Sequence, residues 1–252
     1  MESPRDGLKV LELRQYTLHP GARDTLVDLF DEHFVESQEA LGMHVLGQFR
    51  DTGDPDRFVW IRGFEDMESR AHALEAFYSG PVWMKHRAAA NATMVDSDNV
   101  LLLRPAGEGA GFAFDPRTRP GTFDPERPAG VLVATLHYFD HAVDPTFLSW
   151  FGSEVVPALA RAGTSVLARL VTEPAPNTFP RLPVREGENV FAWFAAYPDA
   201  EAHRAFLRKL EELPEWSAGL GPRLRSMTRG EPERLLLAPT RRSALRFRSG
   251  RS

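Results

Sequence analysis

The sequence predicts an α+β protein built from two tandem β-α-β-β-α-β units, because the chain is internally repeated. Residues 58–83 align without a gap to residues 191–216, and seven of the 26 aligned positions are identical. Two of the matches are tryptophans, in a chain that has only five. A repeat of this kind defines the architecture before any single element is assigned. The identical pairs are Phe58/Phe191, Trp60/Trp193, Asp66/Asp199, Glu68/Glu201, Leu74/Leu207, Pro81/Pro214 and Trp83/Trp216.

The first repeat opens with a strand and a helix. Val10–Leu18 alternates as a half-buried strand does, and the turn residues that follow it end the strand. From Leu26 to Phe34 apolar residues recur every three or four positions, which is the spacing of one buried helical face. Gly42 is predicted to end this helix, since glycine readily adopts the left-handed conformation found there.

A hairpin, further helix and closing strand complete the first repeat. Asp66 is predicted to cap the helix that follows the hairpin, because its side chain can accept from an unpaired backbone N–H. Gly80 and Pro81 should interrupt that helix near Tyr78. The remaining predicted elements are strands Met43–Arg50, Arg57–Phe64 and Val100–Arg104, and a helix that carries Trp83 and runs to about Asn91.

The second repeat follows the same order. Asp144 is the expected cap of its first helix, with Pro145 in the first turn, and Asp199 is the expected cap of its second. The predicted strands are Val131–Phe139, Thr164–Val171, Val190–Tyr197 and Arg234–Ala238.

This order is that of the ferredoxin-like unit, an antiparallel sheet with helices on one face. We therefore predict ferredoxin-like units at residues 8–105 and 130–239, a linker at 106–129 rich in Pro and Gly, and a basic tail at 240–252 for which disorder is the simpler interpretation. The long loop at 172–189 contains four Pro, and loops of this length are usually functional covers or disordered.

Composition excludes several classes of protein. There is no Cys, so disulfides, thiolate metal sites and cysteine nucleophiles are ruled out. No apolar run approaches the ~18 residues of a membrane span, and the sequence lacks a signal-peptide core, so we expect a cytoplasmic protein with no membrane partner. Five arginines of the tail leave a net charge of −10 on the rest of a chain whose total is −5, which argues against nucleic acid. The preference for Arg over Lys is typical of a GC-rich bacterial genome.

Strand alternation suggests a chamber between the two sheets. We assign Leu11 and Leu13 to the helix side of the first strand, which sends Glu12, Arg14 and Tyr16 to the opposite face. That face is too aromatic for water and too polar for a plain core, so we expect it to form one wall of a closed chamber. The other residues assigned to the chamber are His44, Leu46, Gln48, Arg50, Phe58, Trp60, Arg62 and Phe64, and from the second unit Ala134, Leu136, Tyr138, Ser165, Leu167, Arg169, Val171, Phe191, Trp193, Ala195 and Tyr197.

The first half resembles a known family. The segments LELRQYTLHPGARDTL (11–26), GMHVLGQFRD (42–51), FVWIRGFEDM (58–67) and GPVWMKHRAAANATMVDSDNVLLL (80–103) are similar to the NIPSNAP family of the dimeric α/β-barrel superfamily. The resemblance is close over about residues 8–105 and weak in the second half. It implies two ferredoxin-like sheets closed face to face, within one chain or between two. It implies little about activity, because related barrels include cofactor-independent monooxygenases, isomerases, cyclases and haem-degrading enzymes, and function depends on the site.

The chamber residues indicate a ligand with negative charge and an aromatic body. Arg14, Arg62 and Arg169 could bind a carboxylate, phenolate or enolate, although an internal Glu12–Arg14 ion pair is an equal alternative. Glu12, with a pKa raised in a drying chamber, or His44 could move a proton. The expected catalytic residues are Glu12, Arg14 and His44, and the expected substrate-binding residues are Tyr16, Gln48, Trp60, Arg62, Tyr138, Arg169 and Trp193.

The leading hypothesis is a small-molecule enzyme of bacterial metabolism, specialised metabolism included, that works without a cofactor or metal. It would catalyse proton transfer, cyclisation or cofactor-free oxidation of an aromatic or polyketide-like substrate, and it could form a homodimer. One alternative is a non-catalytic ligand-binding or scaffold protein. A further alternative is a haem-binding barrel with His86 as axial ligand. Asp96–Asn99 has the composition of part of a calcium loop but lacks the remaining ligands, so a turn is the simpler interpretation.

Overall fold

Eight antiparallel strands close into one barrel within this single chain. The computed structural model describes residues 7–121 and 129–247. Around the barrel the strands run in the order β1-β3-β2-β9-β6-β8-β7-β5, and β5 pairs with β1 to complete the ring, while the short β4 pairs with the end of β1. A second chain is therefore not needed to close the sheet.

The first half contributes four barrel strands and the helices of one side. Its elements are β1 (Val10–Leu18), α1 (Arg23–Leu29), η1 (Phe30–Phe34), α2 (Val35–Glu39), β2 (His44–Asp51), β3 (Arg57–Phe64), α3 (Met67–Tyr78), α4 (Pro81–Asn91), β4 (Met94–Asp96) and β5 (Val100–Pro105), followed by the single turn η2 (Pro116–Thr118).

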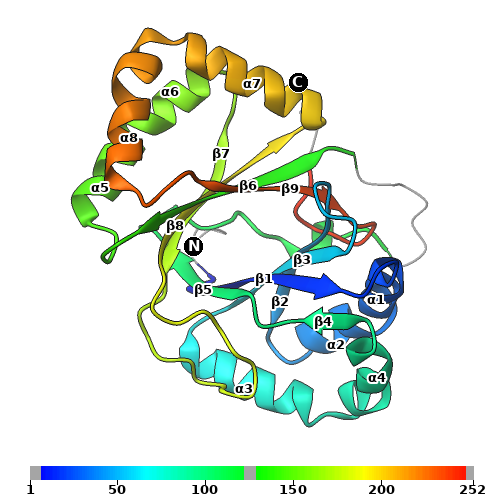
Figure 1. The fold of residues 1–252 in the computed structure, drawn as a ribbon. Coiled ribbons are helices and arrows are strands. Elements are labelled where there is room, and N and C mark those ends of the chain that lie inside the picture. The colour runs from blue at the N-terminus through cyan, green and yellow to red at the C-terminus, as the bar shows by residue number, and fades with distance from the viewer. Residues whose placement is uncertain (1–6, 122–128, 248–252) are drawn as a thin grey trace.

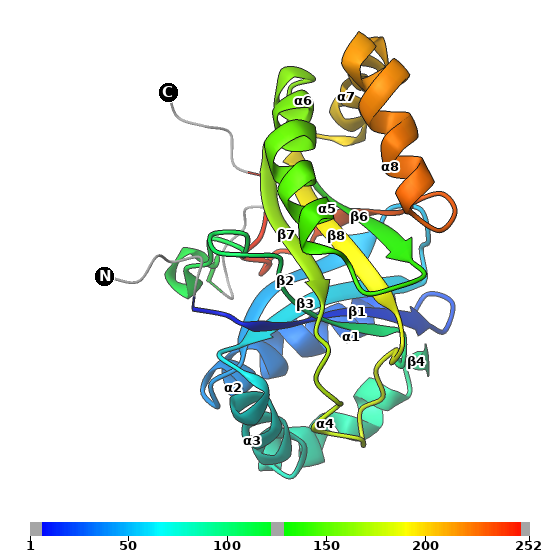
Figure 2. The ribbon, with the colours of Figure 1, turned by 90° about the vertical axis from the view of Figure 1, so that its left-hand side faces the viewer.

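The second half contributes the other four strands and the helices of the opposite side. Figures 1 and 2 show α5–α8 on one side of the barrel and α1–α4 on the other. Its elements are β6 (Val131–Phe139), α5 (Pro145–Trp150), η3 (Phe151–Val155), α6 (Val156–Arg161), β7 (Val166–Thr172), β8 (Asn189–Tyr197), α7 (Ala200–Glu212), η4 (Trp216–Leu220), α8 (Gly221–Met227) and β9 (Glu233–Pro239).

The predicted helix ends are confirmed by their capping contacts. The carboxylates of Asp66, Asp144 and Asp199 each accept a hydrogen bond from a backbone N–H in the first turn of α3, α5 and α7. Gly42, at φ +84°, ends the first helical segment. In each half that segment contains one wider π-helical turn, η1 or η3, a feature often found next to functional sites.

The inside of the barrel is a packed apolar core, so the predicted chamber is wrong. Leu11, Leu13, Val59 and Ile61 point inward, whereas Tyr16, Phe58 and Trp60 pack under the helices, the reverse of the expected faces. The inward-facing cluster comprises Leu11, Leu13, Leu46, Phe49, Val59, Ile61, Leu101, Leu103, Phe112, Leu132, Ala134, Leu136, Ala168, Leu170, Val190, Ala192, Phe194, Leu235 and Leu237.

The error has a physical cause. An eight-stranded barrel is just wide enough inside to be filled by its own side chains, so medium-sized apolar residues occupy it. The longer aromatic and arginine side chains face the helix layer instead. Irregular pairing between Val45 and Gly47 and between Val166 and Ala168 also shifts the alternation along β2 and β7.

Only some of the predicted chamber residues face inward. Leu46, Ala134 and Leu136 point into the barrel as expected, and Leu167 and Tyr138 pack against the same cluster. The helix-facing cluster of the second half instead contains Val171, Phe191, Trp193, Ala195 and Tyr197.

The described part of the basic tail is docked rather than free. Arg242 is buried, forms an ion pair with Glu36 and donates to the backbone carbonyl oxygens of Asp31 (3.0 Å) and Pro120 (3.2 Å). Ser243 donates to Leu245 and accepts from the backbone N–H of β2. The expectation of a disordered tail is therefore wrong up to residue 247, and Arg248 and Arg251 lie outside the described residues.

Docking of the tail places one carboxyl group in an unusual setting. Asp31 lies on η1, buried, and accepts a hydrogen bond from the Gln48 side chain at 3.3 Å. Burial raises the pKa of Asp31 to about 6, although Arg241 and Arg242 oppose this shift.

Asp31→Asn should change the pH dependence of stability. Between about pH 4 and about pH 6 the folded protein holds a proton that the unfolded chain has lost, so this group lowers the free energy of unfolding as pH rises. The variant should match the wild type near pH 3.5 and exceed it at pH 7, by on the order of 2 kcal/mol. Urea unfolding across this range measures the difference. Glu212→Gln, an exposed carboxyl group on α7 that does not act on Asp31, is the control, and a pH-independent difference for Asp31→Asn would contradict the assignment.

Candidate functional site

Three buried arginines share one buried glutamate beneath the helices of the first half. The Glu12 carboxylate accepts from Arg14 Nη1, Arg62 Nε and Arg70 Nε, each at 2.7 Å. The side chains of all four residues are 1% exposed or less. The expected Glu12–Arg14 ion pair therefore exists, but it is part of a larger cluster.

Two strands and a helix position this cluster. Glu12 and Arg14 alternate on β1, and Arg62 lies directly opposite Glu12 on β3, so the three side chains share the helix-facing side of the sheet. Arg70 approaches from α3, one turn after the Asp66 cap. Sequence reasoning missed Arg70, although its spacing with Ala73 and Phe77 places it on the buried face of that helix.

The cluster carries an excess of positive charge. Three guanidinium groups against one carboxylate leave a formal charge of +2 on these four side chains. Burial pushes the pKa of Glu12 upward, but Arg62, Arg14 and Arg70 outweigh it and hold that pKa well below its usual range. The raised pKa expected for Glu12 is therefore wrong, and an ionised Glu12 with three partners is a poor base.

Unused hydrogen-bond donors surround the cluster. Within the described residues, Nη2 of Arg62, Nη2 of Arg70 and Nε1 of Trp60 are buried and have no partner. Buried donors are usually paired, because an unpaired one costs about 1–3 kcal/mol. Positive charge together with unpaired donors is an arrangement that favours a bound anion.

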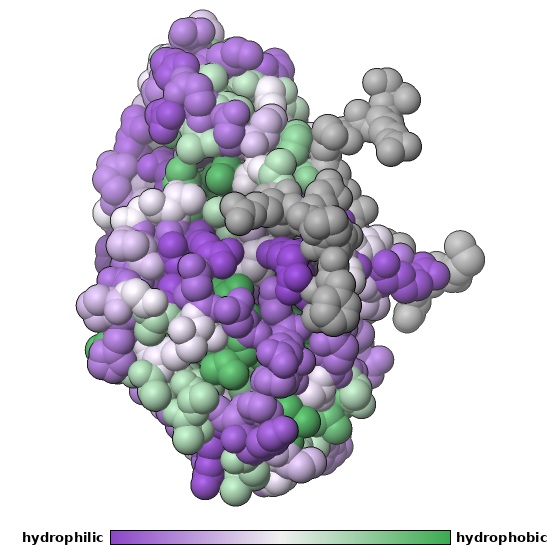
Figure 3. All heavy atoms as spheres, turned by 90° about the vertical axis from the view of Figure 1, so that its right-hand side faces the viewer, coloured by the Kyte–Doolittle hydropathy of each residue, from purple (hydrophilic) through white to green (hydrophobic). Residues whose placement is uncertain are grey.

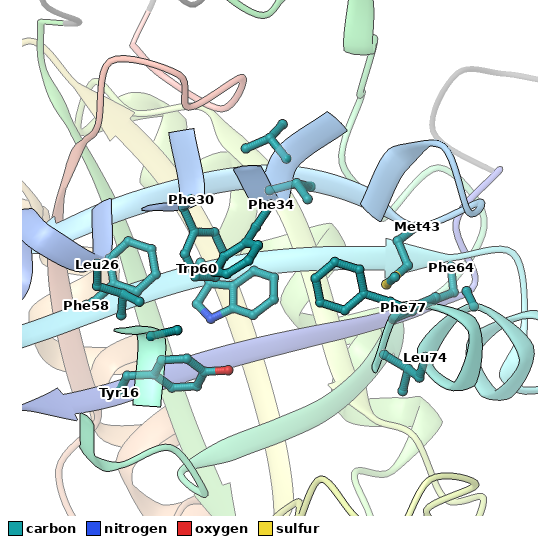
Figure 4. Close-up of a cluster of buried hydrophobic side chains, with 14 of the residues drawn as sticks. Tyr16, Leu26, Phe30, Phe34, Met43, Phe58, Trp60, Phe64, Leu74 and Phe77 are labelled. Carbon is teal, nitrogen blue, oxygen red and sulfur yellow. The ribbon is translucent and has the colours of Figure 1, made fainter. Parts of the chain in front are cut away.

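Aromatic rings enclose a small void next to the arginines. Tyr16 accepts from Arg14 Nε at 2.9 Å and meets Trp60 edge-on, with 6.0 Å between ring centroids. Figure 4 shows Phe30 and Phe34 from η1 on one side of Trp60 and Tyr16 on the other. The void has a volume of about 20 Å³, room for roughly one water. It is lined by Tyr16, Leu26, Phe30, Phe34, Gln38, Trp60, Phe77, Tyr78, Trp83, Ala90 and Met94.

The long loop between β7 and β8 covers this site from the other half of the chain. Arg70 Nη1 donates to Asn177 Oδ1 (3.0 Å) and Thr178 Oγ1 (3.2 Å). Phe179 is buried and stacks on Tyr78, with 5.8 Å between centroids. In Figure 1 the loop runs from the barrel down to α3. A predicted cover thus lies over the arginine cluster.

Larger hollows exist, but their chemistry is weaker. One of them, about 590 Å³, is an open groove between residues 112–118 and the tail, with Phe114, Leu245 and Phe247 among its lining residues. It has no buried charged group in its lining. Volume alone therefore does not select the site.

Five of the predicted site residues come together and five do not. Glu12, Arg14, Tyr16, Trp60 and Arg62 form the cluster and its aromatic wall, on the helix side rather than inside the barrel. Gln48 lies beside Trp60 but donates to Asp31. The His44 ring packs against Phe114, Tyr138 bonds to Glu233 and Arg185, the Arg169 guanidinium lies against Gly152, and Trp193 packs under the helices of the second half.

Neither a metal site nor a membrane span is found among the described residues. In residues 7–121 and 129–247 no group of three or more His, Asp or Glu could hold a metal ion. No helix in the same ranges is long and apolar enough to cross a membrane. On the face in Figure 3, hydrophobic residues lie in small groups among hydrophilic ones wherever grey atoms do not cover them. His86, the residue of the haem alternative, stacks on His33 with 3.8 Å between ring centroids.

A family model decides the identity of the first half. The NIPSNAP model matches residues 11–107. Residues 11–107 are a NIPSNAP domain. The match ends just after β5, so the NIPSNAP domain contains Glu12, the three arginines that pair with it and the aromatic wall. No curated protein matches the chain.

Solved structures of low sequence identity share the whole barrel. A candidate monooxygenase from Fusobacterium nucleatum aligns over 93% of both chains, at 11% identity and a TM-score of 0.53. An anthrone oxidase-like protein aligns over 99% of both chains, at 16% identity and a TM-score of 0.52. A second candidate monooxygenase, from Lactobacillus acidophilus, covers 93% of this chain and 97% of its own at 12% identity, with a TM-score of 0.50. At these identities the likeness shows the α/β-barrel fold alone.

Glu12→Gln should strongly destabilise the protein. The substitution leaves three buried guanidinium groups without a counter-charge, and removing one partner of a buried ion pair costs roughly 3–5 kcal/mol. The matched control is Glu201→Gln on α7, which removes an exposed carboxylate paired with Arg204 and Arg208 and should cost less than about 1 kcal/mol. Chemical unfolding at pH 7 compares the two, and equal losses would refute the buried cluster.

Proposed function

We propose that the NIPSNAP domain binds an anionic aromatic molecule between β1, β3 and the helices α1–α4. The observation that carries the proposal is the buried +2 charge beside an aromatic void. Two donors line that void, the Tyr16 hydroxyl and the Trp60 indole N–H. Tyr16 accepts from Arg14 through its oxygen, so its own proton is available to a ligand.

The arginines would act from behind this aromatic wall. Arg14 holds the Tyr16 hydroxyl, and Arg62 holds the side-chain oxygen of Gln38 at 3.0 Å. Burial raises the pKa of Tyr16, which keeps the hydroxyl protonated as a donor. The guanidinium charges would favour the ionised form of a bound phenol or enol in this dry setting. Glu12 would be a positioning residue that aligns the three arginines.

Such a site supports reactions that develop negative charge on an aromatic substrate. Fixed donors aimed at a developing oxyanion stabilise a transition state more than a neutral ground state. When the substrate is a phenol or an enolisable ketone, proton transfer, cyclisation and cofactor-free oxidation can each begin with the loss of a proton that leaves a phenolate or an enolate. The name of one similar structure, anthrone oxidase-like protein, fits this class, because anthrone becomes an aromatic enolate when it loses a proton.

A non-catalytic binding protein is the second candidate. Two observations favour it. The void has room for only about one water. The carboxylate of Glu12 is paired with three arginines, so it is a poor catalytic base. A ligand larger than water requires the loop over Arg70 or the helices to move. Catalysis would then need a base other than Glu12 to accept the proton of the substrate.

We also infer that both halves are ferredoxin-like units in tandem, at residues 8–105 and 130–239. The strand order β5-β1-β3-β2 in the first half and β9-β6-β8-β7 in the second supports this interpretation. Because the barrel is closed within one chain, a homodimer would not form by joining sheet edges and would use other surfaces.

Removing the two ligand-facing donors should weaken anion binding. Tyr16→Phe and Trp60→Phe keep the rings and delete one donor each. We expect each to raise the Kd for 2-naphthoate by about tenfold, the value of one hydrogen bond to a charged group. Isothermal titration calorimetry measures the Kd. Trp193→Phe, the repeat-related position, is the matched control and should leave Kd unchanged. Equal affinity in all four proteins would contradict the proposed site.

Oxygen uptake separates enzyme from binding protein. If the site is catalytic, wild-type protein should accelerate the reaction of anthrone with O₂ to anthraquinone and water, and Tyr16→Phe should reduce that rate at least tenfold. An oxygen electrode follows the reaction. Binding of 2-naphthoate without any acceleration would support the binding-protein alternative for this substrate class.

A further inference from the structure

A second void lies in the C-terminal half at the position equivalent to the first. It is lined by Trp193 and Trp216, the repeat partners of Trp60 and Trp83, which line the void of the first half. Its volume is about 70 Å³, compared with about 20 Å³ in the first half. Neither the NIPSNAP match nor the proposed anion site includes it.

The strand register shows which residues occupy equivalent positions in the two halves. Trp60 on β3 lies opposite Arg14 on β1, and Trp193 on β8 lies opposite Thr135 on β6. Thr135 therefore occupies the place of Arg14. The shift from a long cation to a short neutral side chain enlarges the void and removes a charge.

The same comparison places a histidine where the first half has its tyrosine. Phe58 lies opposite Tyr16, and its repeat partner Phe191 lies opposite His137. His137, not Tyr138, is thus the counterpart of Tyr16. The charged cluster has no equivalent, because Glu12, Arg62 and Arg70 correspond to Val133, Ala195 and His203.

His137 is buried without a partner. The residue is 4% exposed, and neither ring nitrogen has a hydrogen-bond partner in the described chain. Burial, with a smaller effect of Arg234, lowers the pKa of His137 to about 4. At neutral pH the imidazole is uncharged, so one nitrogen donates and the other accepts. Both are left unused on the wall of a void, an arrangement that usually costs free energy.

Charge is confined to the mouth of this void. The residues with formal charge in its lining, Glu211, Arg225, Glu231 and Arg234, are all exposed. The inner wall is neutral, with His137, Thr135 and His203 as its polar groups. The apolar part of the lining consists of Phe151, Val155, Leu159, Trp193, Phe206, Leu207, Leu210, Trp216 and Leu224.

We propose that this second void binds a small, neutral, mainly apolar molecule that carries one hydroxyl group, such as a phenol or an alcohol. The hydroxyl pairs with His137 at the inner end, and the apolar body lies between Trp193 and the side chains of α7 and η4. The void opens towards exposed residues, so a body larger than the inner space extends to the mouth. The two halves of the chain would then hold ligands of different charge.

Phenol and toluene test this proposal as a matched pair. The two molecules have nearly the same shape, and only phenol has a hydroxyl. We expect wild-type protein to bind phenol about tenfold more tightly than toluene, the effect of one buried hydrogen bond. In His137→Phe the preference should disappear while toluene binding persists. Calorimetry or ligand-detected NMR measures both affinities.

Controls locate the binding event. Tyr138→Phe removes a hydroxyl from the next residue of β6, which bonds to Glu233 and Arg185 outside this void, and should leave the preference for phenol unchanged. Wild-type indole N–H signals of Trp193 and Trp216 should shift on phenol addition, and Thr135→Val provides a second variant should His137→Phe not fold. The proposal is overturned if phenol does not bind saturably, if it binds no better than toluene, or if Tyr138→Phe abolishes the preference for phenol and His137→Phe does not. These outcomes are independent of 2-naphthoate binding in the first half.

Discussion

The width of a closed eight-stranded barrel constrains where the largest side chains of its strands can lie. Leucine, valine, isoleucine and a few phenylalanine side chains fill the interior. The indole of Trp60 and the guanidinium groups of Arg14 and Arg62 are placed on the outer face of the strands, beneath the helices. Polar and aromatic chemistry is therefore found in two separate layers, one for each half, and not in a shared central chamber.

The two layers have matching frames but differ in the side chains that fill them. Both retain a tryptophan on the third strand of the repeat, a second tryptophan after the following helix, and a π-helical turn above the sheet. In the first half Glu12 and three arginines fill the space between these features. In the second, Val133, Thr135, Ala195 and His203 occupy the corresponding positions. The two tryptophans and the π-helical turn thus enclose a charged, nearly filled site in the first half and a larger neutral void in the second.

Contacts between the halves tie the first site to the whole chain. The loop after β7 reaches across to Arg70, and Phe179 joins the aromatic cluster of the first half. The tail places Arg242 against Glu36 and Asp31. The repeat alone did not indicate either contact, because the loop and the tail are the parts that the two halves do not share. Arg70 was likewise missed, since a single arginine in a helix usually lies in solvent.

Local sequence signals determined the order and approximate ends of the eight barrel strands and of most helices, because capping residues, turn residues and apolar spacing act over a few residues. The short strand β4 and the helix α8 were not predicted. The segments at 11–26, 42–51, 58–67 and 80–103 also indicated the family, and the composition of the first strands indicated an anionic aromatic ligand as a hypothesis. Only the tertiary structure decided which face of each strand is inside. Alternation gives two faces but not their direction, and the choice depends on how much volume the closed barrel leaves. That volume is a property of all eight strands together.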